Sequence, residues 1–457
     1  MGGARTAIFN LLYARRFGGS LLLRIEDTDV ERSRQHHAEQ IISSLEWLGV
    51  EWDEGPIYQS DRLARYRQRA EELVEKGLGY RCYCSAEELD DERTTAEKAG
   101  KHYRYSGRCR RAAEEGQRGQ GEHVIRFKVH DRPIDVHDLV RGEVHFEGQL
   151  IDDFVVLRSD GHPTYHLSVV VDDIDMEITL VARGDDHLSN TPKHILLFEA
   201  LGGVVPRFAH LPLILGTDKK RLSKRTGATS VEEYRDLGIL PEALFNFLSL
   251  LGWSPGNDRE IFTSSESAGL FDFAGVNKAP AVFDQEKLIW MNSQYLMRMA
   301  PESIVPHLRP FISEVIAEAP NLLQLIALYQ PRARTLKELS EALAPYFVEA
   351  SQLPYEQEAV RKHLKGGELE VRIRKLRDGF SQIEAFSLDS TEAVLRKVAE
   401  EEGVGAGKLI HPLRLALTGK GSSPPIFDVL VALGRERSLA RIDRLLEELP
   451  SLASGAA

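Results

Sequence analysis

The chain has 457 residues, a length that favours two to four domains over a single hydrophobic core. Hydrophobic residues make up 42% and charged residues 28%, as in ordinary globular proteins, and no apolar run is long enough to span a membrane. The N-terminus lacks a signal-peptide pattern, so we expect a cytoplasmic protein without a membrane partner. The formal net charge of −12 argues against non-specific coating of nucleic acid, although a local basic face can still bind a phosphate backbone.

Apolar residues at helical spacing follow the glycine pair at the start of the chain. They predict a helix from about the third residue to a second glycine pair at 18–19. Residues 20–25 (SLLLRI) then predict a buried strand, which leads into the acidic sequence EDTD. Carboxylates at the carboxyl end of a parallel strand lie where α/β sheets bind ligands, so Glu26 is a binding candidate, whereas Asp29 is better explained as a helix cap. A second helix is expected over about 60–76.

The three cysteines are too few for a disulfide framework, and they cluster at Cys82, Cys84 and Cys109. Three thiols at this spacing in a reducing compartment suit zinc, which prefers four soft or borderline ligands in a tetrahedron. Free thiols at a site without metal are an equally weighted alternative. The segments HVIRFKV and RGEVHFEGQ farther on alternate in polarity, which predicts the strands of a hairpin.

Two polar residues stand out in the next part of the chain, and the second of them is a candidate for binding an acidic substrate. Tyr165 follows a Gly-His-Pro turn, and a buried tyrosine with a satisfied hydroxyl is the usual explanation of such a residue. Arg183 comes at the end of a strand expected over 178–181. There a guanidinium can bind a carboxylate through two parallel hydrogen bonds, although an ion pair with Asp185 or Asp186 would also account for it.

A strongly basic loop follows an apolar strand expected at 211–215. A Gly-Thr-Asp turn comes next, and then five positive charges fall within the seven residues 219–225. Such a loop can hold a polyphosphate by charge and hydrogen bonds, and it can stabilise the negative charge that develops in phosphoryl chemistry. Charge density alone favours the alternative, a solvated basic turn.

The pattern becomes uniformly helical from about residue 300 onward, for example in LKELSEALAPYF and PPIFDVLVALGRERSLARIDRLLEEL. This predicts an all-α C-terminal domain. Charge scattered over helix surfaces is the default explanation of the arginines and lysines in this part of the chain.

Six motifs are spread in order along nearly the whole chain: GGARTAIFN, RIEDTD, PTYHLSVVVDD, RGDDHLSNTP, RLSKR and FDQEKLIWMN. Together they resemble the motifs of the bacterial-type glutamyl-tRNA synthetases, a family of class I aminoacyl-tRNA synthetases. RLSKR is similar to the Lys-Met-Ser-Lys-Ser signature loop of that class, with Arg221 in the first position, which keeps the charge but changes the shape. The resemblance favours the polyphosphate-binding interpretation of the basic loop.

The resemblance implies an α/β fold: a Rossmann-like catalytic domain, an inserted α+β domain that binds the tRNA acceptor end, and an all-α anticodon-binding domain. The implied divisions are the first catalytic half at 1–79, the inserted domain at 80–160, the second catalytic half at 161–228, a stem-contact region at 229–300 and the anticodon-binding domain at 301–457. In the family, a first strand and a signature histidine precede the first helix. We expect both to be missing from the sequence as given.

The implied reaction is the ATP-dependent activation of L-glutamate to glutamyl-adenylate, followed by transfer to the 3′ end of tRNA(Glu), with Mg²⁺ as the metal ion. Lys224 would stabilise the transition state at the α-phosphate, assisted by Arg221. The residues that the resemblance assigns to ATP binding are Gly2, Gly3, Asp186, His187, Leu222, Ser223, Lys224 and Arg225.

Three further sets of residues take their roles from the resemblance. Those that would bind glutamate are Glu26, Tyr165 and Arg183. Those that would contact tRNA are Arg332, Arg104 and Arg108. Those that would bind zinc are Cys82, Cys84, Tyr105 and Cys109. One departure concerns the amino-acid site, because Val169 stands where the family often has an asparagine, which removes one polar contact.

Two alternatives remain beside a glutamate-tRNA ligase. The absence of the first strand would suit a catalytically impaired paralogue that binds tRNA. A non-discriminating synthetase that also charges tRNA(Gln) is the second alternative, and transfer of glutamate to a modified tRNA base is disfavoured by the long helical C-terminal part. The family also leads us to expect a monomer.

Overall fold

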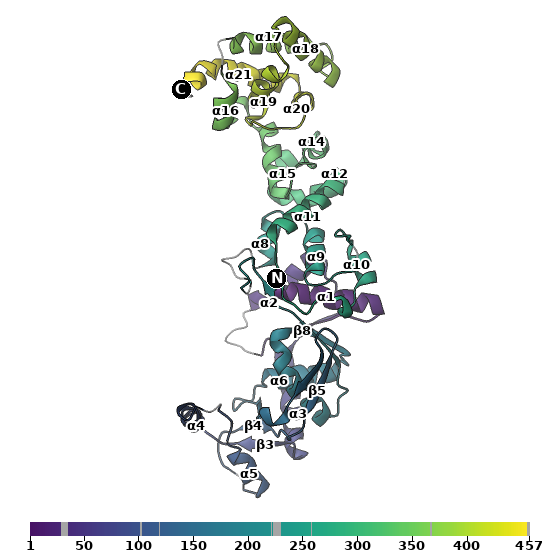
Figure 1. Cartoon of the computed structure of the whole chain (residues 1–457), viewed down its shortest axis with the longest axis vertical. Coiled ribbons are helices and arrows are strands. Elements are labelled where there is room, and N and C mark those ends of the chain that lie inside the picture. The colour runs from purple at the N-terminus through teal and green to yellow at the C-terminus, as the bar shows by residue number, and fades with distance from the viewer. Residues whose placement is uncertain are drawn as a thin grey trace. The chain divides into compact units, whose positions relative to one another are not determined.

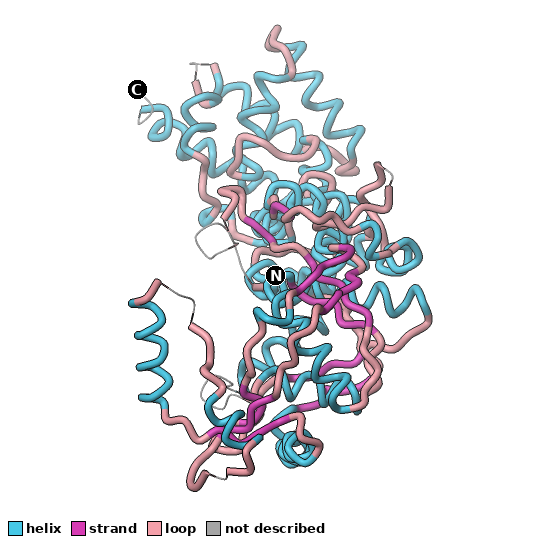
Figure 2. The backbone as a smooth tube through the Cα atoms, turned by 60° about the horizontal axis from the view of Figure 1, so that its bottom comes forward, coloured by secondary structure: helices cyan, strands magenta, loops and turns pink. Residues whose placement is uncertain are grey.

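The computed structural model describes residues 1–28, 35–100, 103–117, 119–220, 222, 230–256, 258–365 and 368–454. The chain forms two compact units (Figure 1). Unit 1 consists of Met1–Glu233 and Leu244–Gln285, and unit 2 consists of Tyr234–Ala243 and Glu286–Ala457. Every described strand belongs to unit 1, whereas unit 2 is built from helices, as Figure 2 shows in magenta and cyan.

Unit 1 begins with the predicted helix, α1 (Gly2–Phe17), which buries Ile8, Phe9 and Leu12. It ends at Gly18, whose φ of 66° is a left-handed conformation that glycine adopts without steric cost. The predicted strand follows as β1 (Leu22–Ile25) and pairs in parallel with β2 (Glu54–Tyr58), with α2 (Gln35–Trp47) between them in sequence. The expectation that β1 is buried is wrong, because the strand is only half-buried and lines a cavity.

A four-stranded sheet in the order β6-β5-β9-β8 forms the second part of unit 1. Its strands are β5 (Ile134–Asp138), β6 (Gly142–Phe146), β8 (Leu180–Gly184) and β9 (Arg207–Leu211). The pairs β5·β9 and β9·β8 are parallel, and β6 is antiparallel to β5. The helices α3 (Leu63–Glu75), α6 (Tyr165–Asp175) and α7 (Thr191–Leu201) supply much of the apolar core beside this sheet.

The cysteines lie in and beside a three-stranded antiparallel sheet. Its order is β3-β4-β7, with β3 (Gly79–Cys82), β4 (Val124–Phe127) and β7 (Val155–Leu157), and it is accompanied by α4 (Ala86–Lys98) and α5 (Arg108–Glu114). Both segments expected to form a hairpin are strands, β4 and β6. The predicted hairpin is wrong, because the two strands do not pair with each other. β4 pairs with β3 and β7, whereas β6 pairs with β5 in the other sheet.

The remaining elements of unit 1 are a short strand pair and helices, one of which covers α1. β10 (Ile214–Leu215) pairs in parallel with β11 (Ala281–Val282), and α10 (Ser264–Leu270) packs on α1. The helices α8 (Val231–Asp236) and α9 (Pro241–Leu250) cross from one unit to the other. The predicted strand at 211–215 is divided between β9 and β10, because Pro212 has no N–H with which to continue a strand ladder.

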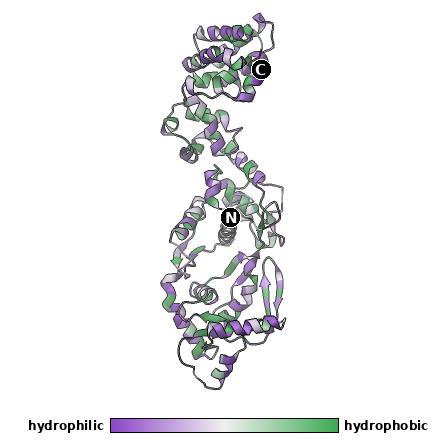
Figure 3. Ribbon diagram, turned by 90° about the vertical axis from the view of Figure 1, so that its left-hand side faces the viewer, coloured by the Kyte–Doolittle hydropathy of each residue, from purple (hydrophilic) through white to green (hydrophobic). Residues whose placement is uncertain are grey.

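Unit 2 confirms the all-α prediction for the C-terminal part, since its regular elements within the described residues are helices. They are α11 (Gln285–Arg298), α12 (Pro301–Leu308), α13 (Glu314–Ala317), α14 (Leu322–Tyr329), α15 (Leu336–Leu343), α16 (Gln357–His363), α17 (Leu369–Ser381), α18 (Leu388–Glu401), α19 (Gly407–Thr418), α20 (Ile426–Leu433) and α21 (Arg435–Ser454), with short 3₁₀ turns between some of them. Both apolar and polar residues occur along these helices, as Figure 3 shows in green and purple. Buried Arg441 on α21 donates to the carbonyls of Leu417, Pro345 and Val348 and so joins three segments of the bundle. Among the helices described in either unit, none combines the length and the hydropathy that a membrane span requires.

Candidate active site

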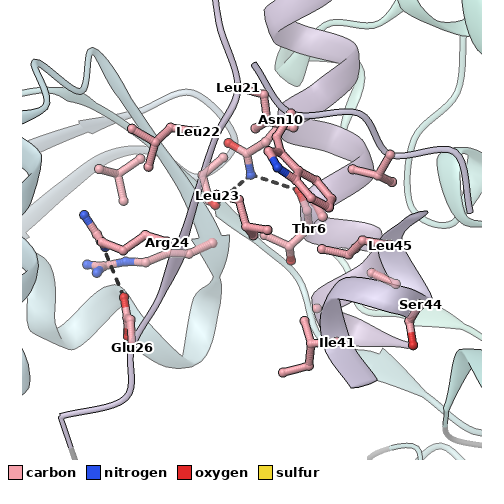
Figure 4. Close-up of a pocket in the computed structure, with 18 of the residues that line it drawn as sticks. Thr6, Asn10, Leu21, Leu22, Leu23, Arg24, Glu26, Ile41, Ser44 and Leu45 are labelled. Atoms are coloured by element: carbon pink, nitrogen blue, oxygen red, sulfur yellow. Dashed lines mark hydrogen bonds and ion pairs between the residues drawn. The ribbon is translucent and has the colours of Figure 1, made fainter. Parts of the chain in front are cut away.

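A cavity of about 860 Å³ lies in unit 1, and it is lined by residues of α1, α2, β1, α6 and β8. Figure 4 shows Thr6 and Asn10 of α1 beside Leu21 and the β1 residues Leu22 and Leu23. Consecutive residues of both β1 and β8 line the cavity. Within the described residues β1 pairs only with β2, and β8 pairs only with β9, so each strand has one unpaired edge.

The three predicted glutamate-binding residues converge on this cavity from different elements. Glu26 follows β1, Tyr165 begins α6, and Arg183 lies within β8 rather than after it. Two of the predicted ATP-binding residues, Gly3 and His187, also line the cavity. The lining does not include Gly2 or Asp186, although both residues are described, and the Asp186 side chain is exposed. Val169, the departure from the family pattern, lines the cavity and is buried.

Three charged side chains of the lining, Arg24, Glu26 and Asp173, lie close together. Arg24 forms an ion pair with Asp173 at 2.7 Å and reaches Glu26 at 3.4 Å, as the dashed line to Glu26 in Figure 4 indicates. Burial raises the pKa of Asp173 despite the favourable charge of Arg24. Glu26 keeps 45% of its side chain exposed, so its carboxylate is accessible to a cationic group that enters the cavity.

Arg183 is held by hydrogen bonds from all three of its nitrogens. Nε lies 3.2 Å from Nε2 of His210, and Nη1 lies 3.1 Å from the Tyr165 hydroxyl and 3.3 Å from Nδ1 of His194. Nη2 donates to Thr191 Oγ1 at 3.0 Å and to the carbonyl of His187 at 3.3 Å. The alternative interpretation, an ion pair with Asp185 or Asp186, is not the arrangement found, and Asp185 pairs with Arg141 instead.

Two hydrogen-bonded pairs adjoin Arg183, one of a histidine with an aspartate and one of two histidines. His210 is fully buried, and its Nδ1 lies 2.6 Å from Oδ2 of buried Asp138. His194 is 1% exposed, and its Nε2 lies 3.2 Å from Nδ1 of His166. Burial lowers the pKa of His166 to about 4 and the pKa of His194 well below its usual value, and the charges of Lys193 and Arg183 act in the same direction. Both imidazoles are therefore neutral at pH 7.

Backbone hydrogen bonds hold the stem of the basic loop. A turn follows β10, in which Gly216 N–H donates to the Lys220 carbonyl at 2.8 Å, and Lys219 adopts a φ of 60°. The N–H of Leu222 donates to the carbonyl of Ile214 at 3.3 Å. Leu222 is the predicted site residue of this loop that the structure describes; Arg221, Ser223, Lys224 and Arg225 lie outside the described residues.

Arg5 is a buried residue of the site region that the sequence pattern did not indicate. It lies on α1, is 3% exposed, and donates to the carbonyls of Pro212 and Leu251. Burial lowers its pKa to about 10. Because Pro212 lies two residues before β10, Arg5 joins α1 to the segment that leads into the basic loop. The sequence feature that could have indicated Arg5 is its position on the apolar face of a predicted helix, where a charged residue is unusual.

The four predicted zinc ligands lie together. The thiol sulfurs of Cys82, Cys84 and Cys109 lie within 4.8 Å of one another. The hydroxyl of Tyr105 is 3.4 Å from the Cys82 sulfur and 3.6 Å from the Cys84 sulfur. Three soft donors and one oxygen thus face a common point, which is a donor set and a geometry that fit Zn²⁺.

The three predicted tRNA-contacting arginines lie outside the cavity. Arg104 pairs with Asp152 at 2.8 Å and Arg108 pairs with Glu88 at 2.6 Å, both beside the cysteine cluster. Arg332 belongs to unit 2, where it donates to the carbonyl of Ser423 at 2.7 Å. All three occupy the surface, so each guanidinium is accessible to a phosphate or a base.

Residues 1–290 match the family described as tRNA synthetases class I (E and Q), catalytic domain, and residues 303–446 match the anticodon binding domain family. The chain belongs to the class I tRNA synthetases of the glutamyl and glutaminyl type, which confirms the family inferred from the six motifs.

The chain is 41% identical to Glutamate-tRNA ligase 1 of Caldanaerobacter subterraneus subsp. tengcongensis over 98% of this chain and 95% of that protein. It is 44% identical to Glutamate-tRNA ligase of Geobacter sulfurreducens over 98% of this chain and 96% of that protein. The crystal structure of a glutamate tRNA ligase from Elizabethkingia meningosepticum in complex with its amino acid superimposes with a TM-score of 0.85 at 33% identity, covering 98% of this chain and 96% of that one.

The neutral histidines predict how stability depends on pH. Unfolded histidine takes up a proton near pH 6.5, whereas His166 and His194 resist protonation in the folded state. The free energy of unfolding should therefore fall between about pH 6.5 and pH 4, by up to about 1.4 kcal/mol per pH unit for each group. Urea unfolding at pH 7, 6 and 5 should show a smaller decline for His166→Gln than for the wild type. The exposed His130→Gln serves as the control, and an equal decline in all three proteins would contradict the assignment.

Proposed function

We propose that this chain is a glutamate-tRNA ligase. It activates L-glutamate with ATP to form glutamyl-adenylate and pyrophosphate, and it transfers the glutamyl group to a terminal ribose hydroxyl of tRNA(Glu). The observation that carries the proposal is the convergence of Glu26, Tyr165 and Arg183 on one cavity. The similarity to proteins named glutamate-tRNA ligase over nearly the whole chain supports it and favours it over a tRNA-binding protein without activity.

The charges in the cavity suit glutamate as the substrate. The Tyr165 hydroxyl accepts from Arg183 and can donate its own O–H to the side-chain carboxylate. Arg183 would exchange one of its protein acceptors for that carboxylate, since a guanidinium is the preferred partner of a carboxylate. The exposed carboxylate of Glu26 suits the α-ammonium group. With both ends of the amino acid held, its α-carboxylate can be directed towards the α-phosphate of ATP, which converts a bimolecular encounter into an oriented reaction.

The N-terminus of α1 and the basic loop provide for ATP. Gly2 and Gly3 have no side chains, so phosphate groups can approach the N–H groups at the start of a 16-residue helix. Lys224 and Arg221 stabilise the charge on the α-phosphate in the transition state, Leu222, Ser223 and Arg225 complete the loop, and Asp186 and His187 lie on the adenosine side. Mg²⁺ bound with ATP would neutralise charge on the phosphates and on the departing pyrophosphate.

The tRNA extends over both units in this proposal. Arg104 and Arg108, in the inserted domain at 80–160, contact the acceptor end, and Arg332, in the helical domain at 301–457, contacts the anticodon. The match of residues 303–446 to an anticodon binding domain supports the second assignment. The enzyme would act as a monomer in the cytoplasm, where tRNA is charged.

Charging assays with radiolabelled glutamate test the proposal. The wild-type protein should charge tRNA(Glu) in the presence of ATP and Mg²⁺. Lys224→Ala should reduce the rate on the order of a hundredfold, because it removes a preorganised charge from the developing transition state. Lys76→Ala is the control, since this exposed lysine only pairs with Glu72 on α3. Tight tRNA binding without any charging would contradict the proposal, and equal charging of tRNA(Gln) would contradict the specificity.

We also propose that the cluster Cys82, Cys84, Tyr105 and Cys109 binds one structural Zn²⁺. The convergent donor set described above supports this assignment. Zinc would join β3 to α5 and to the segment before it, and no ligand position is left for a substrate. The contribution of the ion is therefore to the stability of the region that carries Arg104 and Arg108.

The zinc proposal predicts a measurable metal content. Protein purified without chelators should contain about one zinc per chain by mass spectrometry. Cys84→Ser should lose most of it, because serine is a poor ligand for Zn²⁺, whereas Ser106→Ala in the same segment should retain it. Three freely reactive thiols in metal-free wild-type protein would contradict the proposal and favour the free-thiol alternative.

A further inference from the structure

The guanidinium of Arg183 is surrounded by acceptors, and three of them, on His210, His194 and Thr191, belong to residues to which the proposed reaction gives no role. An arginine carries five N–H groups, one on Nε and two on each terminal nitrogen. Five acceptors lie within hydrogen-bonding distance of them: His210 Nε2, the Tyr165 hydroxyl, His194 Nδ1, Thr191 Oγ1 and the His187 carbonyl. The side chain therefore has one orientation built for it by the protein, before any substrate binds.

The direction of these hydrogen bonds fixes the proton on His210. Arg183 Nε–H can only donate, so Nε2 of His210 must be the acceptor and carries no hydrogen. The hydrogen of the neutral ring then sits on Nδ1 and is donated to Asp138 Oδ2 at 2.6 Å. Asp138 is itself fixed, because it accepts from the backbone N–H groups of Val140, Arg141 and His210.

The same reasoning applies to the second histidine pair. Arg183 Nη1 donates to Nδ1 of His194, so His194 carries its hydrogen on Nε2 and donates it to Nδ1 of His166. A proton added to Nδ1 of His194 or to Nε2 of His210 would place an N–H against an N–H of Arg183. Both histidines are almost completely buried, so water cannot take over the lost hydrogen bond.

We propose that Asp138, His210 and His194 are positioning residues that set the plane of Arg183 for the substrate carboxylate by holding defined histidine tautomers. The inference rests on the proposed function only for the identity of that carboxylate. The residues meet from three parts of the chain, namely the end of β5, the strand β9 and the helix α7. An arginine that is ordered before glutamate binds loses less conformational entropy on binding, so the expected effect of these residues is on the affinity for glutamate.

The variant Asp138→Asn tests the tautomer directly. The side-chain oxygen of asparagine can keep the backbone N–H donors, and its NH₂ group would then face Nδ1 of His210. The histidine must shift its hydrogen to Nε2, opposite Arg183 Nε–H, and this reversal follows the same logic as the aspartate-to-asparagine change in a serine-protease triad. We expect the KM for glutamate to rise about tenfold or more, with kcat and the KM for ATP changed by no more than about threefold.

Asp153→Asn is the matched control. Asp153 is also a buried carboxylate that accepts from a backbone N–H, that of Val129, and from a side-chain hydroxyl, that of Tyr80. It should lower stability without raising the KM for glutamate. A purely structural role of Asp138 would give the same result as this control, and that outcome would overturn the proposal.

Nitrogen-15 NMR of histidine-labelled wild-type protein gives a second readout that requires neither turnover nor a stable Asp138 variant. The chain has 15 histidines, and His210→Gln and His194→Gln identify the two signals. We expect Nδ1–H at His210 and Nε2–H at His194 at pH 7, with both signals shifted by glutamate and unchanged by ATP alone. The opposite tautomers, or protonated rings, would overturn the proposal. A wild-type protein with these tautomers but without glutamate-dependent charging would instead count against the proposed function.

Discussion

The hydrogen bonds of Arg183 are the constraint on which the candidate site depends. A guanidinium that faces a cavity must have its N–H groups satisfied before a substrate binds, because a buried unpaired donor costs about 1–3 kcal/mol. In this protein the acceptors are two buried imidazoles, a threonine hydroxyl, a tyrosine hydroxyl and a backbone carbonyl. The fold brings them together by placing β9 next to β8 and the start of α7 behind both strands. The geometry of the site therefore depends on the pairing of the strands as well as on the residues that face the cavity.

Features that depend on neighbouring residues could be predicted from the sequence. The spacing of apolar residues and the stop at Gly18 specify α1, and the helical periodicity after residue 300 specifies the all-α unit. Glu26, Tyr165 and Arg183 were identified by their motifs, and they line one cavity. The cysteines and Tyr105 lie within 28 residues of sequence, so a local pattern was sufficient to group them.

Features that depend on distant pairing could not be predicted in the same way. Asp138 and His210 are 72 residues apart, and no local pattern links a carboxylate at the end of β5 to a histidine in β9. The hairpin expected from β4 and β6 fails for the same reason, because alternation shows that a segment is a strand but does not select its partner. β1 is only half-buried because a cavity lies beside it. The burial of Arg5 requires hydrogen bonds to the carbonyls of Pro212 and Leu251, which lie more than 200 residues away in the sequence.

The central claim is that the cavity around Arg183 selects an amino acid with a negatively charged side chain for activation by ATP. The most direct measurement compares glutamate with glutamine in ATP-pyrophosphate exchange, with tRNA(Glu) present in both reactions. Glutamine has nearly the same shape as glutamate but lacks the charge that a guanidinium recognises. The account predicts exchange with glutamate and little or none with glutamine. Equal exchange with both amino acids, or exchange with glutamine alone, would contradict it.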